Sequence, residues 1–192
     1  MNRILLSASL FPLFLPGMAL AHPGHIGGDV FAAGIGHPLG GADHVLAMVA
    51  VGLWAALMGG RAMLTLPLAF VTAMLVGGLA GAAGLPLPGV EPMILASIVA
   101  LGAAAALALR PALAHAMAAV ALFGLFHGHA HGAEGPAAGL ALYAAGFALA
   151  TIALHLAGVG LGLGLIRLSR AAVVRGLGGV TAMAGLALAI AG

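Results

Sequence analysis

The chain of 192 residues contains no cysteine and no lysine, and only four of its residues are acidic. Without cysteine there is no disulfide framework and no thiolate metal site. Without lysine the GxxxxGK[ST] phosphate-binding loop is absent, so the chain carries no ATP-driven motor of its own. Charged residues make up 5% of the chain and hydrophobic residues 64%. This composition indicates an integral membrane protein whose partner is the lipid bilayer, and it gives no nucleic-acid footprint.

Residues 1–21 resemble a secretory signal peptide. Arg3 supplies the positive charge, an apolar core follows, and Ala19-Leu20-Ala21 has the small-x-small form of a cleavage site. An uncleaved anchor helix is the alternative, although the apolar core is short for a membrane span. We therefore expect a cleavable signal peptide at 1–21 and one transmembrane permease domain at 22–192.

The remaining chain is predicted to be all-α, a polytopic membrane bundle of six transmembrane helices. The expected spans are residues 41–58, 62–82, 92–109, 112–131, 137–166 and 171–191. Glycine and proline mark the connections between them. Glycines at four-residue spacing predict close helix packing, and they are Gly124, Gly128 and Gly132 in the fourth span, and Gly158, Gly160, Gly162 and Gly164 in the fifth.

The charged residues predict the orientation of these spans. Five arginines fall in or beside alternate loops on one side, namely Arg61, Arg110, Arg167, Arg170 and Arg175, and the acids Asp29, Asp43, Glu91 and Glu134 fall on the other. The arginine side is expected to be cytoplasmic under the positive-inside rule. The protein is thus predicted to lie in the bacterial inner membrane with its mature N-terminus in the periplasm.

Nine histidines outnumber the acids, and the first group of them opens the first expected span as His37-Pro-Leu-Gly-Gly-Ala-Asp43-His44. Pro38 suits the first turn of a helix. On one regular helix His37 and His44 would share a face at a separation of about 10 Å, from which two imidazoles could still converge on one ion. Asp43 is either a third ligand or a group that orients a ring. The alternative is a polar helix start whose histidines cap backbone groups.

The second group ends the fourth expected span, from Phe126 to Glu134. His127 and His131 are four residues apart, the spacing at which two helical imidazoles chelate one ion. Glu134 follows on the same face if the helix continues, and His129 points nearly the opposite way. A solvent-exposed histidine run is the alternative. Both groups are expected at the outer membrane face, where four histidines and two carboxylates would suit Ni²⁺, Co²⁺ or Zn²⁺.

These motifs resemble the HupE/UreJ family of hydrogenase and urease accessory proteins. The matching residues are the H-x5-D-H motif ending at His44, the FHGHAHG-x-E motif ending at Glu134, and the His-Pro-Gly-His of residues 22–25. The resemblance implies a nickel permease rather than an enzyme, with no prosthetic group. Its cargo would be Ni²⁺, taken up from the periplasm for nickel-enzyme maturation. The shared motifs do not separate Ni²⁺ from Co²⁺.

Five further histidines are possible accessory ligands or relays: His22, His25, His115, His129 and His155. The first two could capture metal or could belong to a free chain end. His155 is expected below the membrane midplane, where it could face His115 across the exit, or where each could be a histidine bonded to a backbone carbonyl.

Two other functions remain open from the sequence. One is a membrane-embedded hydrolase that uses His and Asp to activate a metal-bound water. Against it, no serine or tyrosine is expected beside either histidine group. The other is a metal sensor or chaperone without transport. The sequence also leaves open whether the protein forms a homo-oligomer.

Overall fold

The computed structural model describes residues 30–191, and every regular element in that part of the chain is helical. Seven helices follow one another: α1 (Val30–Gly40), α2 (Ala42–Met58), α3 (Ala62–Ala82), α4 (Val90–Ala106), α5 (Leu113–Ala133), α6 (Leu140–Arg167) and α7 (Ala171–Ala191). The predicted signal peptide, His22 and His25 lie outside the described residues. The prediction of an all-α fold is confirmed for the described part.

Four of these helices, α3, α5, α6 and α7, are long and apolar enough to cross a membrane. The bent pair of α1 and α2 passes the same test together, which brings the candidates to five. A sixth span would require α4, which is apolar but has 17 residues. The chain is therefore a multi-pass membrane protein with four to five candidate spans among the described residues.

The predicted bounds of the first span, 41–58, agree with α2 to within one residue, but the interpretation of Pro38 as the first turn of that helix was wrong. Pro38 lies in the last turn of a separate helix, α1, instead of opening the long one. Between α1 and α2 the axis bends by 80°, because Gly41 is extended (φ −99°, ψ 120°) and interrupts the helical hydrogen bonding. His37 and His44 therefore belong to two different helices and do not share the face of one.

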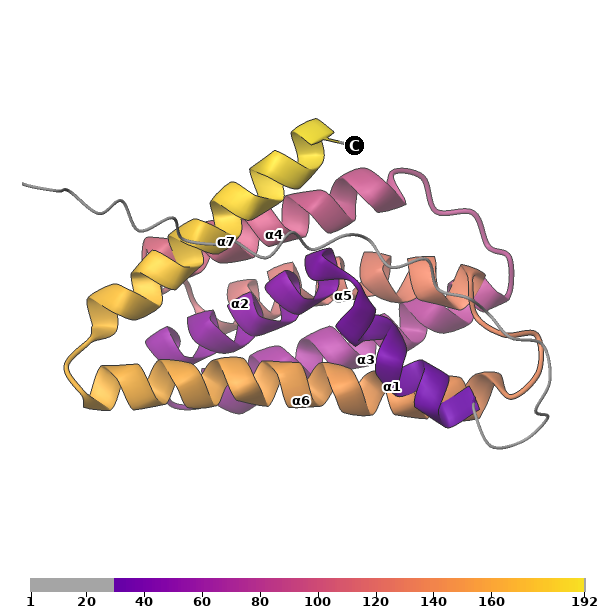
Figure 1. The fold of residues 1–192 in the computed structure, drawn as a ribbon, viewed down its shortest axis with the longest axis horizontal. Coiled ribbons are helices and arrows are strands. Elements are labelled where there is room, and N and C mark those ends of the chain that lie inside the picture. The colour runs from indigo at the N-terminus through magenta and orange to yellow at the C-terminus, as the bar shows by residue number, and fades with distance from the viewer. Residues whose placement is uncertain (1–29, 192) are drawn as a thin grey trace, which may run out of the picture.

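Figure 1 shows α1 lying across one end of the long helix α6, which runs the length of the bundle. The crossing is close because glycines stand at the contact. A Cβ added at Gly34 would lie 2.2 Å from the Tyr143 carbonyl oxygen, and one at Gly146 would lie 2.3 Å from that of Phe31. The small residues thus hold α1, and His37 with it, against α6.

Helices α3 and α5 pack backbone to backbone along the predicted glycine ridge of α5. A Cβ at Gly124, Gly128 or Gly132 would lie within 2.4 Å of a carbonyl oxygen of α3. In α6, Gly158 makes a similar approach to α2, whereas Gly160 and Gly164 face open space. The predicted packing role is therefore correct for the α5 ridge and wrong for Gly160 and Gly164.

Replacing Gly128 with alanine should destabilise the fold, because its Cβ would lie 1.8 Å from the Met74 carbonyl oxygen and force α3 and α5 apart. We expect a loss of about 1–3 kcal/mol, typical of overpacking. The matched control is Gly160→Ala, which adds the same methyl group where nothing lies within 4 Å. Unfolding of the purified protein in mixed micelles measures both, and equal stabilities of the two variants would contradict the packing account.

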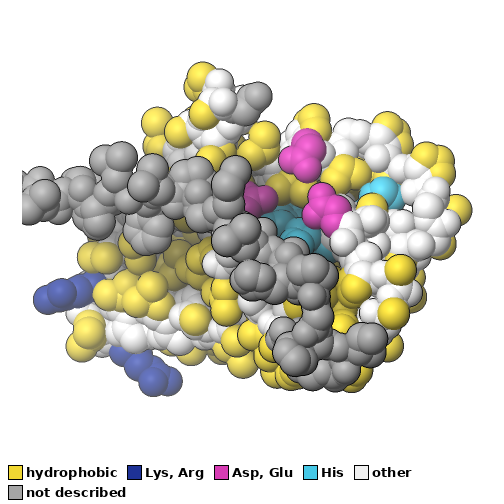
Figure 2. All heavy atoms as spheres, turned by 45° about the vertical axis from the view of Figure 1, so that its right-hand side comes forward, with side chains coloured by type: hydrophobic (Ala, Val, Ile, Leu, Met, Phe, Trp, Pro, Cys, Tyr) yellow, Lys and Arg dark blue, Asp and Glu magenta, His cyan; other side chains and the backbone are white. Residues whose placement is uncertain are grey.

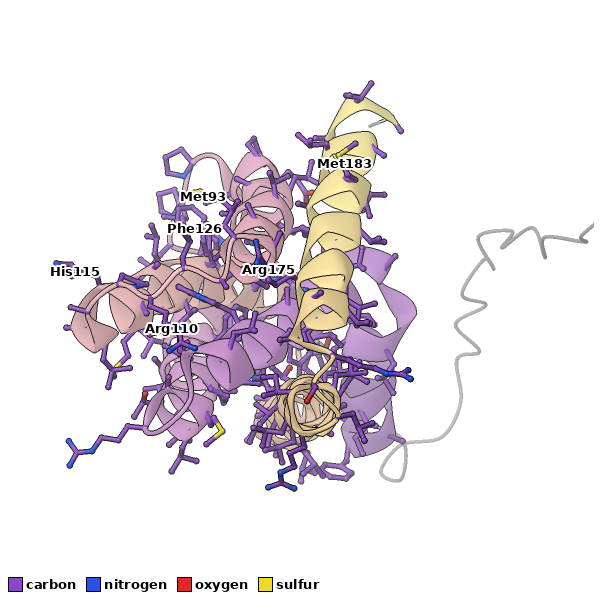
Figure 3. All side chains as sticks on the ribbon, turned by 90° about the vertical axis from the view of Figure 1, so that its left-hand side faces the viewer. Met93, Arg110, His115, Phe126, Arg175 and Met183 are labelled. Carbon is purple, nitrogen blue, oxygen red and sulfur yellow. The ribbon has the colours of Figure 1, made fainter. Side chains whose placement is uncertain are left out.

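The two ends of the bundle differ in charge. Figure 2 shows acidic side chains gathered around histidines on one part of the surface, with arginines at the far end of the view. Two arginines also tie helices together, since Arg110 donates to the Leu57 carbonyl (2.9 Å) and Arg175 to that of Ala106 (2.8 Å). Both point toward neighbouring helices in Figure 3. The histidine motifs and the arginines therefore mark opposite ends of the protein.

Candidate metal site

The two histidine motifs meet in space although they are about 80 residues apart in sequence. His44 stands in the first turn of α2, where the bend at Gly41 sets the direction of the helix. His127 and His131 stand in the last two turns of α5, on the face that α5 buries. The result is a group of imidazoles between α2 and α5.

Three ring nitrogens of this group converge on one point. The Nε2 atom of His44 lies 3.0 Å from Nδ1 of His127 and 2.5 Å from Nε2 of His131. The rings meet edge to face, with centroids 4.6 and 4.2 Å apart. His127 is completely buried, and the other two are less than 10% exposed. We call His44, His127 and His131 the nitrogen trio.

The neighbours of the trio determine which nitrogens carry protons. Asp43 Oδ2 lies 3.2 Å from Nδ1 of His44 and holds a proton there, which leaves the lone pair of Nε2 facing the trio. The hydroxyl of Ser97 donates to the Ile94 carbonyl (2.6 Å), so at His127 it accepts from Nε2–H (2.9 Å). The remaining nitrogen of His127 then also presents a lone pair.

Two lone pairs pointed at each other across 3.0 Å repel unless a proton or a metal ion is shared between the two nitrogens. The far nitrogens of both rings are held by a carboxylate and a hydroxyl, as is usual for histidines that bind metals. The nitrogen trio could therefore hold a cation, and its all-nitrogen donors would suit a borderline divalent ion such as Ni²⁺, Co²⁺ or Zn²⁺.

A second set of donor atoms lies beside the trio and nearer the surface. His37, His131 and Glu134 each offer a ligand atom, and these atoms lie within 4.8 Å of one another. His37 and Glu134 are exposed and His131 is buried. The His37 ring meets that of His131 at 4.7 Å between centroids, and its Nδ1 atom lies 2.8 Å from the Tyr143 hydroxyl. We call His37, His131 and Glu134 the surface group; it shares His131 with the trio.

The role of Asp43, left open by the sequence, follows from its position. Its carboxylate contacts the outer nitrogen of His44 rather than the point of convergence, so it orients the ring. Gly41 leaves room for this contact, since a Cβ there would lie 2.6 Å from Asp43 Oδ1. A glycine in the H-x5-D-H motif thus both bends the chain and admits the carboxylate.

Ser97 and Tyr143 correct the expectation that no serine or tyrosine lies beside the histidines. Ser97 comes from α4 and Tyr143 from α6, and each is a lone polar residue in an apolar run, so the sequence carried no signal for either. The Ser97 proton is committed to a backbone carbonyl. Ser97 therefore positions His127 and is not arranged as a nucleophile with His127 as its base.

Two of the accessory histidines lie away from the trio. His129 points outward, and its Nε2 atom donates to the Leu85 carbonyl at 2.7 Å. His115 is exposed near the start of α5 and points away from the bundle (Figure 3). Neither has a place in the surface group or in the trio. His155 lies deeper and is fully buried.

An apolar pocket of about 260 Å³ lies between α3, α5 and α6 and reaches the His131 ring. Its walls include Met74, Leu79, Leu140 and Phe147. His131 and Tyr143 are the polar side chains of its lining. The pocket therefore offers too few ligand atoms to coordinate an ion by itself.

Comparison with known proteins decides the family. A family profile described as HupE / UreJ protein matches residues 10–188. The chain belongs to the HupE/UreJ family. It is also 42% identical over 188 residues to Protein HupE of Rhizobium leguminosarum bv. viciae, with 96% of this chain and 97% of that protein covered. No solved structure is significantly similar to it.

The family consists of hydrogenase and urease accessory proteins, which are not an enzyme class, and the predicted resemblance is thereby confirmed. Within this HupE/UreJ protein, the two motifs that carried the resemblance are the segments that supply the nitrogen trio and the surface group.

Proposed function

We propose that this HupE/UreJ protein is a secondary transporter that takes up a divalent transition-metal ion for the maturation of hydrogenase or urease. Ni²⁺ is the ion we favour, with Co²⁺ as the alternative cargo. The observation that carries the proposal is the convergence of His44 Nε2 and His127 Nδ1, whose far nitrogens are held by Asp43 and Ser97. The family supports nickel as the metal.

In this proposal the ion meets the surface group first and the nitrogen trio second. Glu134 and His37 are exposed and can receive a hydrated cation. His131 belongs to both sets, so the ion exchanges ligands one at a time and is never stripped of all of them. Stepwise exchange avoids leaving a bare charge in a low-dielectric interior, which would be very costly.

The same proposal includes six spans, with α4 as the shortest. A helix of 17 residues is about 26 Å long, at the lower limit for crossing the hydrocarbon core. The arginines would face the cytoplasm under the positive-inside rule. The nitrogen trio would then face the periplasm of the inner membrane, the side from which the ion arrives.

Uptake of ⁶³Ni²⁺ into proteoliposomes that contain the purified protein tests this function. We expect uptake above that of empty vesicles, saturable with Ni²⁺ and inhibited by Co²⁺ more than by Mg²⁺, because nitrogen ligands favour borderline metals over hard ones. Binding of Ni²⁺ without any uptake would instead support a sensor or chaperone. Metal-dependent hydrolysis of amide or lipid substrates without uptake would support the hydrolase.

Uptake should fall as the external pH falls. A histidine must be neutral to bind a metal, so protons compete with the ion for the ring nitrogens as the external pH falls. At a fixed membrane potential we expect the initial rate of ⁶³Ni²⁺ uptake to decline several-fold between about pH 7.5 and 5.5. A rate that rises steadily over this range would contradict competition and indicate proton symport.

A further inference from the structure

Below the nitrogen trio, α3 and α6 face each other in a regular antiparallel register. The Thr151 hydroxyl of α6 donates to the sulfur of Met74 on α3 at 3.7 Å. One turn deeper, the ring of His155 meets that of Phe70 with centroids 5.2 Å apart. Thr151 and His155 are four residues apart, so they share one face of α6.

His155 has no partner in this setting. Its side chain is completely buried, and both of its ring nitrogens lack a hydrogen-bond partner. An unpaired imidazole costs free energy in any protein interior, and more so at membrane depth. A leucine would fill the same space without that cost. The imidazole therefore has a use that packing alone does not explain.

The ring of Phe70 connects His155 to the trio. It contacts both His127 (5.5 Å between centroids) and His155 (5.2 Å). Phe70 is itself completely buried. The two histidines thus contact the same aromatic side chain, which links His155 to the trio.

Toward the arginine end the core becomes apolar. Among the described residues of α3 and α6, no polar side chain is buried beyond His155 on that side; the next buried residues are Pro67 and Leu66 of α3 and Gly158 and Val159 of α6. His155 is therefore the deepest buried polar group between these two helices. The side chains packed beyond it toward the arginine end are apolar.

We propose that His155, Thr151 and Met74 form a second binding site for the transported divalent ion, which we call the deep station. It rests on the proposed transport function and specifies where the ion goes after the nitrogen trio. Its donors are an imidazole nitrogen, a hydroxyl oxygen and a thioether sulfur. This mixture accepts a borderline transition metal and disfavours Mg²⁺ and Ca²⁺, which require oxygen ligands.

The test measures Ni²⁺ binding and ⁶³Ni²⁺ uptake on the same variants, by calorimetry in detergent and in proteoliposomes with an imposed potential. In His155→Leu we expect uptake to fall about tenfold or more, as for loss of a metal-site partner. Binding of the first Ni²⁺ at the trio should be unchanged, and thermal stability should be unchanged or higher. His155→Gln, which keeps one ligand atom, should recover part of the uptake.

Thr151→Val provides an independent variant of nearly the same shape. It tests the deep station even if the His155→Leu protein does not fold. Its matched control is Thr181→Val, since Thr181 is a buried threonine of α7 whose hydroxyl bonds only the Leu177 carbonyl of its own helix. Slower uptake in Thr151→Val alone supports the deep station.

Two results would overturn the deep station. Unchanged uptake in His155→Leu and Thr151→Val would make both residues simple core groups. Loss of Ni²⁺ binding together with uptake would place His155 in the outer site. A wild-type protein that binds Ni²⁺ and never transports it would instead refute the proposed function, and that outcome is distinguishable because it appears before any variant is made.

Discussion

Replacing His131 with alanine should reduce Ni²⁺ uptake by about a hundredfold or more, while the protein still inserts into the membrane. Loss of a partner that only orients a ligand already costs ten- to a hundredfold, and His131 offers a ligand atom itself. It also belongs to both donor sets, meeting the His37 ring at 4.7 Å and the His44 ring at 4.2 Å between centroids. Its loss therefore disables the surface group and the trio together.

The control for this prediction is His129→Ala, on the same helix and in the same motif. The His129 ring contacts the Leu85 carbonyl and not the other histidines, so its removal should leave uptake within about twofold of the wild type, as for a residue that touches no ligand. Equal loss in both variants would mean that the motif acts through folding. Normal uptake in His131→Ala would exclude the trio as the path of the ion.

The membrane potential alone should drive strong accumulation. A divalent cation that moves inward gains about 4.6 kcal/mol per 100 mV of inside-negative potential. Because about 1.4 kcal/mol corresponds to a factor of ten, this supports accumulation of roughly two to three thousandfold without ATP. Because the chain has no phosphate-binding loop for ATP, we expect the membrane potential to be the energy source for accumulation.

Proteoliposomes loaded with potassium and treated with valinomycin measure this effect. An outward potassium gradient should raise the final internal ⁶³Ni²⁺, and a reversed gradient should suppress it. Accumulation indifferent to both gradients would indicate electroneutral exchange, for example of one Ni²⁺ against two protons, and would contradict transport driven by the potential.

Hydropathy was sufficient to predict most of the helices, and α3 (Ala62–Ala82) and α7 (Ala171–Ala191) have the predicted bounds. The failure came at α1. It was not predicted as a helix of its own, because Pro38 was interpreted as the first turn of the long helix that follows. In the fold, Gly34 and Gly146 pack against opposing backbone and hold α1 as a separate helix against α6.

The histidine motifs were recognisable because i,i+4 spacing and a neighbouring carboxylate have a local signature. The residues that contact and position these histidines have no such signature in the sequence. Ser97, Tyr143 and Phe70 are single residues in apolar runs, and only the folded arrangement brings them to the histidines. The same holds for the pairing of Met74 with Thr151, which depends on the register between α3 and α6.

X-ray absorption at the nickel edge, with one equivalent of Ni²⁺ bound to the purified protein, tests most directly whether the converging imidazoles hold the ion. We expect a first shell of nitrogen and oxygen atoms only, with the multiple scattering of about three imidazole rings. That imidazole scattering should weaken in His44→Ala. A spectrum without imidazole scattering, or one that is identical in wild type and His44→Ala, would contradict the account.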